Sequence, residues 1–267
     1  MFEKLLVICV FTLIIHMIDT FAYSVRIAGI RTGKIAIALS VFSIIVIVSR
    51  TSNMIQAPLT GSLVDMAKHT GDIAALESQF RVILLSSSLG TVLAALLLPT
   101  FVSMMSRAIV HLEMAGSVPQ LVKNVSTVHH LKIARKHFKL PRRESLSRLR
   151  IGGVPKRILL LNMLAAMIYA DSVLACLYAS LLKPEYSSIA LTSTGLINGF
   201  STIILTVFLD PQIAILTDKV MKGTEKKDSI NKMVGVLTLS RFVGTVLAQL
   251  FLVPFAYYIT WLSQLFA

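Results

Sequence analysis

The chain has 267 residues, of which 55% are hydrophobic and 15% charged, and its formal net charge is +13. This composition excludes a soluble domain of this length and favours an integral membrane protein. The two cysteines, Cys9 and Cys176, both fall in apolar runs, so we interpret them as small core residues and predict neither a disulfide framework nor a zinc site.

Six apolar runs approach or exceed the ~20 residues needed to cross a bilayer, and each should be helical because a spanning segment must satisfy its own backbone groups. The runs cover about residues 3–25, 34–57, 80–104, 157–182, 188–209 and 233–260. A signal peptide is the alternative for the first run, since Lys4 precedes it. His16 and Asp19 inside the run, and the lack of a small-x-small cleavage site after it, favour a retained span.

The chain repeats itself at an offset of about 152 to 154 residues. Leu89–Ala94 returns as Val243–Ala248, with Pro99 after the first copy and Pro254 after the second, and Asp19 returns as Asp171. Three spans per copy is an odd number, so the copies should have opposite orientations if the central segment does not cross. The sequence therefore predicts an all-α membrane protein of two inverted three-helix repeats. The expected units are a first repeat at 1–112, a connector at 113–156 and a second repeat at 157–267.

The connector is strongly basic. Twelve Lys or Arg residues lie from Arg107 to Arg157 against only Glu113 and Glu144, and the positive-inside rule places this segment in the cytoplasm and both termini outside. Apolar residues at helical spacing followed by Lys and Arg predict an amphipathic helix on the anionic inner leaflet, with a solvated linker as the alternative. A nucleic-acid or metal site is not favoured: the run lies between spans, and no carboxylate or cysteine accompanies His129, His130 and His137.

Prolines interrupt both middle spans at matching places. Pro58 and Pro211 should bend or break these helices, which would mark hinges of a transport site; the alternative is that they end the spans at the membrane surface. Gly195 and Gly199 form a GxxxG motif on the fifth span, and we group them with the two prolines as predicted hinge residues. Such small residues predict close helix packing within the molecule, and a homodimer face is the alternative.

Ionisable residues inside the spans are costly and usually face a bundle interior or a wet cavity. His16, Asp19, Tyr23 and Arg26 share one helical face, and we predict coupling or charge-balancing roles for His16, Asp19, Arg26 and the repeat mate Asp171. The alternative is that each aspartate is paired with Arg or His to lock the helices together.

Arginines in the spans indicate an anion site, because a guanidinium keeps its charge and can bind phosphate with two hydrogen bonds. A pyrophosphate headgroup would suit them, and so would intramembrane aspartates as ion-pair partners. The predicted substrate-binding residues are Arg50, Arg241, Arg81, Asn53, Tyr23 and Tyr178. No nucleotide-binding loop or nucleophile elbow occurs, which argues against an ATP-driven pump or a known class of hydrolase, and no cofactor is expected.

Three segments resemble the Amj family, the alternate lipid II flippases of Gram-positive bacteria, and the resemblance extends over essentially the whole chain. They are FEKLLVICVFTLIIHMIDTFAYSVRIAGIRTGKIAIALS, IVSRTSNMIQAPLTGSLVD and IALTSTGLINGFSTIILTVFLDPQIA. The resemblance implies a transporter of the bacterial cell membrane that moves the undecaprenyl-pyrophosphate-linked peptidoglycan precursor from the inner to the outer leaflet. It supplies no catalytic motif.

Three alternatives to this function remain at the level of the sequence. The cargo could be another polyprenyl-phosphate lipid, such as undecaprenyl phosphate. The chain could instead be a membrane enzyme acting on a lipid phosphate with His16 and Asp19 as its catalytic pair. A non-catalytic scaffold is the last, and the duplicated charged spans argue against it, because a scaffold has no need of buried Asp and Arg.

Overall fold

The computed structural model describes residues 2–116 and 154–267, and this part of the chain is helical with no strand. Six stretches are long and apolar enough to cross a membrane, so the predicted all-α membrane protein with six spans is confirmed. The elements are α1 (Phe2–Thr32), α2 (Ile35–Thr70), α3 (Ile73–Ala115), α7 (Lys156–Leu182), η1 (Pro184–Tyr186), α8 (Ser187–Ile203), η2 (Ile204–Leu209), α9 (Asp210–Met221) and α10 (Lys227–Leu265). The amphipathic helix predicted in the connector lies almost entirely outside the described residues.

Local sequence signals end the helices where the chain turns. Gly71 and Gly116 follow α2 and α3 with φ of 71° and 72°, a left-handed conformation that costs glycine nothing because it has no Cβ. The Asp72 side chain accepts a hydrogen bond of 2.9 Å from the Ala75 N–H and so caps α3. At 43 residues, α3 extends well beyond the span expected at 80–104.

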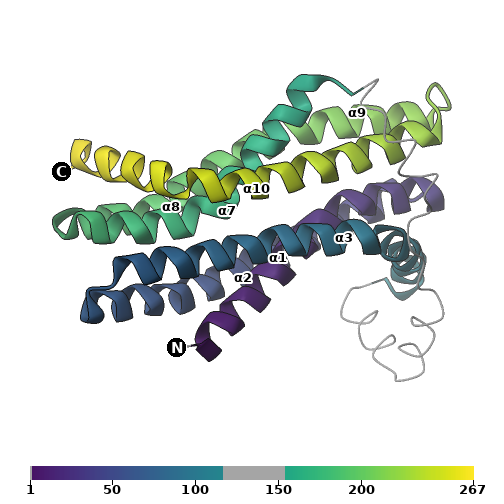
Figure 1. Cartoon of the computed structure of the whole chain (residues 1–267). Coiled ribbons are helices and arrows are strands. Elements are labelled where there is room, and N and C mark those ends of the chain that lie inside the picture. The colour runs from purple at the N-terminus through teal and green to yellow at the C-terminus, as the bar shows by residue number, and fades with distance from the viewer. Residues whose placement is uncertain (1, 117–153) are drawn as a thin grey trace.

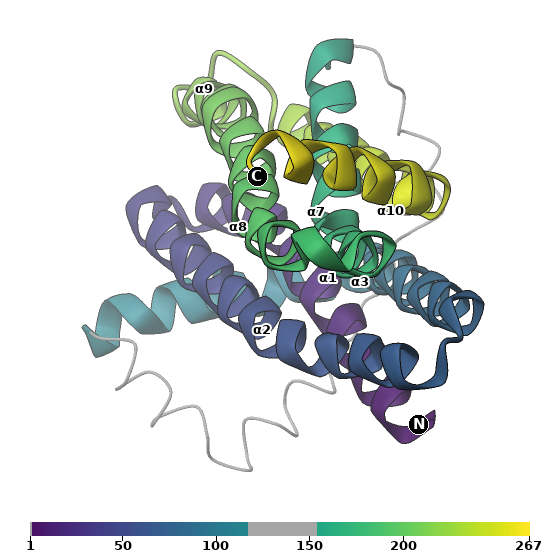
Figure 2. The same ribbon diagram turned by 90° about the vertical axis from the view of Figure 1, so that its left-hand side faces the viewer.

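The helices form two groups of three spans. In the first group α1 packs along α2 and α3, and in the second α7 packs along α8 and α10 (Figure 1). Corresponding helices run in opposite directions along the molecule: α3 and α10 lie side by side, and the chain enters them from opposite ends (Figures 1 and 2). This arrangement is the one that inverted repeats require.

A glycine marks the closest helix crossing in each half. A Cβ added to Gly90 on α3 would lie 2.3 Å from the backbone oxygen of Leu13 on α1, and a Cβ on Gly244 of α10 would lie 2.3 Å from that of Met163 on α7. The small residue therefore permits a close approach of two helix backbones at each of these positions. Nothing lies within 4 Å of a Cβ at Gly195 or Gly199, so the prediction that this pair packs against another helix of the same molecule is wrong.

The prolines of the two middle spans have different effects on helix geometry. The α2 helix continues through Pro58 to Thr70, so Pro58 does not end this helix. In the other half, α8 passes into the π-helical turn η2, and α9 begins at Asp210 with Pro211 next. Because proline has no N–H, the carbonyl four residues before Pro211 loses its helical donor, which fits a change of helix type at this point. A hinge role for either proline stays a prediction.

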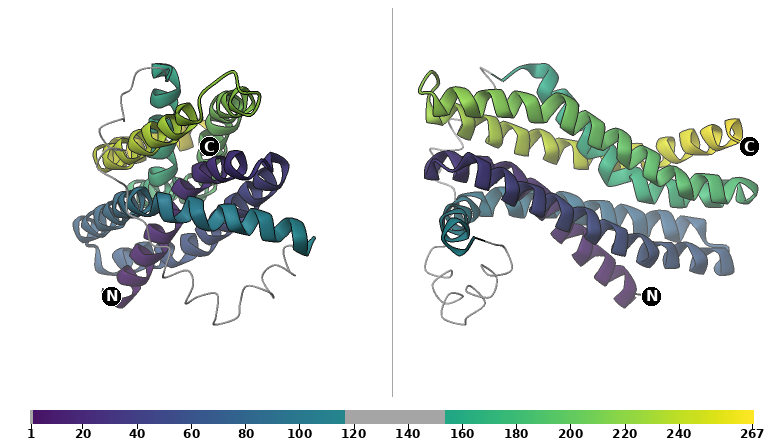
Figure 3. Two further views of the ribbon diagram at one scale, coloured as in Figure 1. Left: turned by 90° about the vertical axis from the view of Figure 1, so that its right-hand side faces the viewer. Right: turned by 180° about the vertical axis from the view of Figure 1, so that it is seen from behind.

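The ends of the molecule differ in charge. The α1–α2 and α9–α10 turns lie at one end, and both chain termini lie toward the other (Figure 3). The first end has more basic than acidic residues, namely Arg31, Lys34, Lys219, Lys222, Lys226 and Lys227 against Asp218, Glu225 and Asp228. The second end has a small excess of acidic residues, namely Asp65, Asp72, Glu77 and Glu185 against Lys68, Arg81 and Lys183. We call these the basic end and the acidic end.

Candidate substrate cavity

A cavity of about 110 Å³ lies between the two halves. Residues of α2 form one flank, residues of α8, η2 and α9 form another, and α1, α7 and α10 form the rest. The lining residues are Asp19, Ala22, Tyr23, Phe42, Val46, Arg50, Ala165, Tyr169, Thr202, Leu205, Thr206, Leu209, Asp210 and Arg241. Three of them belong to the π-helical turn, a kind of helix irregularity that is frequent at functional sites.

Arg241 on α10 binds Asp19 on α1 across the halves. Its Nη2 donates to Asp19 Oδ2 at 2.8 Å, and the two side chains are only 4% and 14% exposed. The Nε of Arg241 has no acceptor in the described part of the chain. A buried guanidinium and carboxylate compensate one another, so this pair contributes little net charge to the cavity wall.

A second ion pair crosses between the halves nearer the basic end. Arg26 Nη2 on α1 donates to Asp210 Oδ1 at 2.8 Å, and the guanidinium carbon lies 5.2 Å from the centre of the Phe42 ring. The alternative stated for the sequence, in which intramembrane aspartates pair with arginines, thus describes both Asp19 and Asp210.

Arg50 is different from the other two arginines because it forms no ion pair with any described residue. Its guanidinium carbon lies 4.6 Å from the centre of the Tyr169 ring on α7, which is a cation–π contact. The His16 ring lies 5.8 Å from the same tyrosine ring. Arg50 therefore faces the cavity with its charge uncompensated.

Tyr23 and Asn162 join the halves through neutral hydrogen bonds. The Tyr23 hydroxyl donates to Asn162 Oδ1 at 2.6 Å, while Asn162 Nδ2 donates to the Leu237 carbonyl at 2.8 Å and to Ser240 Oγ at 2.6 Å. Sequence reasoning missed Asn162 and Tyr169. The signal that could have identified Asn162 is an asparagine within an apolar run, and the structure shows it fully buried.

Comparison with known proteins assigns the chain to a family. The family model described as "Alternate to MurJ" matches residues 11–263. The chain belongs to the Amj family. It is 42% identical over 265 residues to the lipid II flippase Amj of Bacillus subtilis (strain 168), covering 99% of this chain and 98% of that protein. No solved structure matches it.

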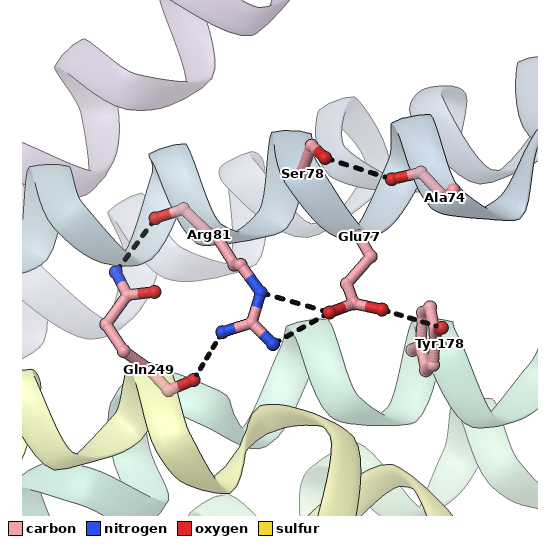
Figure 4. Close-up of polar contacts among 6 residues, drawn as sticks. All are labelled: Ala74, Glu77, Ser78, Arg81, Tyr178 and Gln249. Atoms are coloured by element: carbon pink, nitrogen blue, oxygen red, sulfur yellow. Dashed lines mark hydrogen bonds and ion pairs between the residues drawn. The ribbon is translucent and has the colours of Figure 1, made fainter.

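Three of the predicted substrate-binding residues of this Amj-family chain lie outside the cavity lining. Asn53 is on α2 beyond Arg50, while Arg81 and Tyr178 belong to a separate cluster toward the acidic end (Figure 4). There, Arg81 binds Glu77 Oε1 through Nε at 3.0 Å and Nη2 at 2.7 Å, and the Tyr178 hydroxyl donates to Glu77 Oε2 at 3.3 Å. Arg81 Nη1 donates to the Gln249 carbonyl at 2.7 Å, and Gln249 Nε2 donates to the Arg81 carbonyl at 2.8 Å.

Asp171 also lies outside the cavity lining, although it matches Asp19 in the repeat. It is 1% exposed, and neither carboxylate oxygen has a hydrogen-bond partner among the described residues. The offset of about 154 residues explains the difference, because the residue that matches Arg241 is Ser87. The Ser87 hydroxyl donates to the Leu84 carbonyl within its own helix, so the first half offers Asp171 no arginine.

Proposed function

We propose that this multi-pass membrane protein is a lipid II flippase that moves the undecaprenyl-pyrophosphate-linked peptidoglycan precursor from the inner to the outer leaflet. The 42% identity to a lipid II flippase over nearly the full length of both chains is the observation that carries this proposal. The charged cavity between the halves supports it, because a flippase must carry a polar headgroup across ~30 Å of hydrocarbon while the lipid tail stays in the bilayer.

The lipid headgroup can pass through this cavity only if the two halves of the protein move relative to one another. The cavity volume of about 110 Å³ is well below the ~300–1,000 Å³ of ordinary small-molecule pockets, so the cavity holds a phosphate-sized group and not a disaccharide with its peptide. We propose that residues 1–112 and 157–267 act as inverted repeats that rock against one another, with Pro58 and Pro211 as hinges. The cross-half ion pairs would separate and reform in each cycle.

Arg50 is the proposed anion receptor of the cavity. Arg241 and Arg26 already bind carboxylates, whereas Arg50 binds none among the described residues and contacts only a ring face. A pyrophosphate can accept two hydrogen bonds from one guanidinium, which gives it an advantage over singly bonding anions. Arg241 would join it as Asp19 is released, and Asp19 and Asp171 would balance charge or carry coupling protons.

The proposed orientation puts the basic end in the cytoplasm and both termini outside, as the positive-inside rule requires. The same rule would place the connector at 113–156 in the cytoplasm. A homodimer stays a prediction, and the open Gly195–Gly199 face of α8 is where close helix contact with a second copy would be expected.

The test is lipid II flipping in proteoliposomes, followed with a fluorescent headgroup and a membrane-impermeant quencher, with and without a pH gradient. We expect intact protein to flip and Arg50→Ala to flip at least about tenfold more slowly, because a charge-assisted hydrogen bond is worth roughly 1.5–3 kcal/mol. Arg107→Ala, which removes an exposed arginine of α3, is the matched control. Full activity in Arg50→Ala would reject the receptor role.

Undecaprenyl phosphate is the second candidate cargo, and the small cavity favours it because a single phosphate needs far less space. A competition experiment distinguishes the two candidate cargoes. An excess of unlabelled undecaprenyl phosphate in the same proteoliposomes should leave lipid II flipping nearly unchanged if lipid II is the cargo. Failure of pure folded protein to flip lipid II, together with transport of undecaprenyl phosphate itself, would favour the bare carrier lipid.

A further inference from the structure

A second cavity lies at the basic end of the molecule, on the other side of the Arg26–Asp210 ion pair. It measures about 280 Å³ and is lined by the α1–α2 turn, the beginning of α2, and α9. Its lining residues are Arg26, Gly33, Ile35, Ala38, Leu39, Ala214, Thr217, Asp218 and Met221. Arg26 lines this cavity while its partner Asp210 lines the central one, so the ion pair is the partition between the two spaces.

The charges around this inner cavity favour an anionic ligand. Asp218 is its one acidic lining residue, and that carboxylate is already bound by Lys222 at 2.8 Å. Arg31, Lys219, Lys226 and Lys227 lie at the same end without an ion pair to any described residue, and they outnumber Glu225 and Asp228, which also form none. A cleft with basic surroundings and low-dielectric walls raises the local concentration of anions.

Arg26 can accept such a ligand without first losing its carboxylate. A guanidinium has five N–H donors, and Arg26 uses one of them, on Nη2, for a hydrogen bond to a described residue. An incoming pyrophosphate could take the free edge and then compete with Asp210 for the rest. Asp210 follows the π-helical turn directly and precedes Pro211, so its backbone is not held by a continuous α-helix.

We propose that this inner cavity is the loading site for the diphosphate group of a prenyl-diphosphate lipid, and that displacement of Asp210 from Arg26 opens the way to Arg50. The proposal rests on the proposed function, since it names where the same substrate first binds. Leu39, Ala214 and Met221 give the cavity an apolar wall beside the first isoprene units, while the diphosphate reaches the single deep cation.

The test is ligand protection of a cysteine placed in the cavity. Ala214→Cys, with Cys9 and Cys176 replaced by alanine, is labelled with a maleimide in detergent-solubilised full-length protein, and farnesyl diphosphate is the probe. When the probe is at about ten times its Kd, we expect labelling to slow about tenfold, because only the unoccupied fraction reacts. Farnesol at the same concentration should not protect.

Two further variants assign the effect to Arg26. Arg26→Gln should abolish the protection, whereas Asp210→Asn should preserve it, because no carboxylate then competes with the diphosphate for the guanidinium. Thr224→Cys in the α9–α10 turn, outside the cavity, is the control cysteine and should react at the same rate with and without probe. Met221→Cys repeats the measurement at a second lining position, in case Ala214→Cys does not fold.

Unchanged labelling in protein that flips lipid II would overturn the loading site and leave the proposed function intact. Protection that persists in Arg26→Gln would overturn the assignment to Arg26. Protection without any flipping of lipid II would instead support a diphosphate site and count against the proposed cargo, so the failures of the two proposals are distinguishable.

Discussion

Among the residues that the structure describes, Tyr169 is the side chain that contacts the Arg50 guanidinium from the opposite half. Its ring lies under the guanidinium and also contacts the His16 ring, so it links α7 to both α2 and α1. Without an acidic neighbour to orient it, an arginine on a long flexible stem depends on this contact for its position. Tyr169 is therefore a positioning residue, which acts on substrate through Arg50.

Replacing Tyr169 by leucine should weaken substrate binding by about 2- to 30-fold, because a cation–π contact is worth roughly 0.5–2 kcal/mol. The loss should appear in the lipid II concentration that gives half-maximal flipping, with the maximal rate largely kept. Tyr169→Phe keeps the ring face and should rescue binding. Equal losses in the leucine and phenylalanine variants would show that the hydroxyl, and not the ring, is what matters.

At the scale of the helices, the glycines at the α1–α3 and α7–α10 crossings hold each half together. Gly244→Val would force a side chain into the space occupied by the Met163 carbonyl, 2.3 Å from the new Cβ. Overpacking of this kind costs about 1–3 kcal/mol. We expect a clearly lower thermal midpoint of unfolding in detergent, measured by fluorescence-detected size exclusion after heating.

Gly195→Val is the matched control for the helix crossings, because nothing lies within 4 Å of a Cβ at that position. It should leave the thermal midpoint unchanged or raise it slightly, since glycine is a poor helix former. A similar destabilisation in both variants would mean that glycine flexibility, and not close packing, is required. A loss of dimer in Gly195→Val with unchanged unfolding would point to the homodimer face instead.

Hydropathy alone was enough to predict the six spans, because the length of a membrane-crossing helix is set by the bilayer and not by its neighbours. Helix contacts were harder to predict, since identical motifs behave differently in context. Gly90 and Gly195 both begin small-xxx-small patterns, yet only Gly90 meets another helix. The helical face shared by His16, Asp19, Tyr23 and Arg26 did predict an interior position for these residues, which is where they lie.

The ion-pair partners of the charged residues could not be predicted from the sequence. Arg241 and Asp19 are 222 residues apart and meet only because α10 packs beside α1. The repeat predicts similar neighbours for Asp19 and Asp171. Their neighbours differ because the second copy has Arg241 where the first has Ser87, and Asp171 has no hydrogen-bond partner among the described residues. Residue type alone groups Arg81 and Tyr178 with Arg50, although these two residues lie outside the cavity lining, toward the acidic end of the molecule.

At the scale of the whole molecule, a continuous hydrophobic core runs through both halves, and polar side chains add specific contacts between them. The cluster of Glu77, Arg81, Tyr178 and Gln249 ties α3 to α7 and α10 toward the acidic end (Figure 4). The repeat does not reproduce it at the basic end, because the residues matching Arg81 and Gln249 are Gly235 and Ala95. Rocking of the halves should therefore meet more resistance at the acidic end, which is proposed to face outside.

Breaking this outer cluster should shift the molecule toward an outward-open state. Spin labels on Ala74→Cys and Tyr257→Cys, in protein without Cys9 and Cys176, report the outer separation of α3 and α10 by double electron–electron resonance. In Arg81→Gln we expect a longer and broader distance distribution, because the bond to the Gln249 carbonyl is lost. Labels on Arg31→Cys and Lys222→Cys at the basic end should move closer together, since rigid halves that part at one end approach at the other.

Ser78→Ala, which removes a hydrogen bond within α3 alone, should change neither distance. Lengthening at both ends in Arg81→Gln would indicate that the halves separate as a whole, and the rocking of two rigid repeats would have to be abandoned.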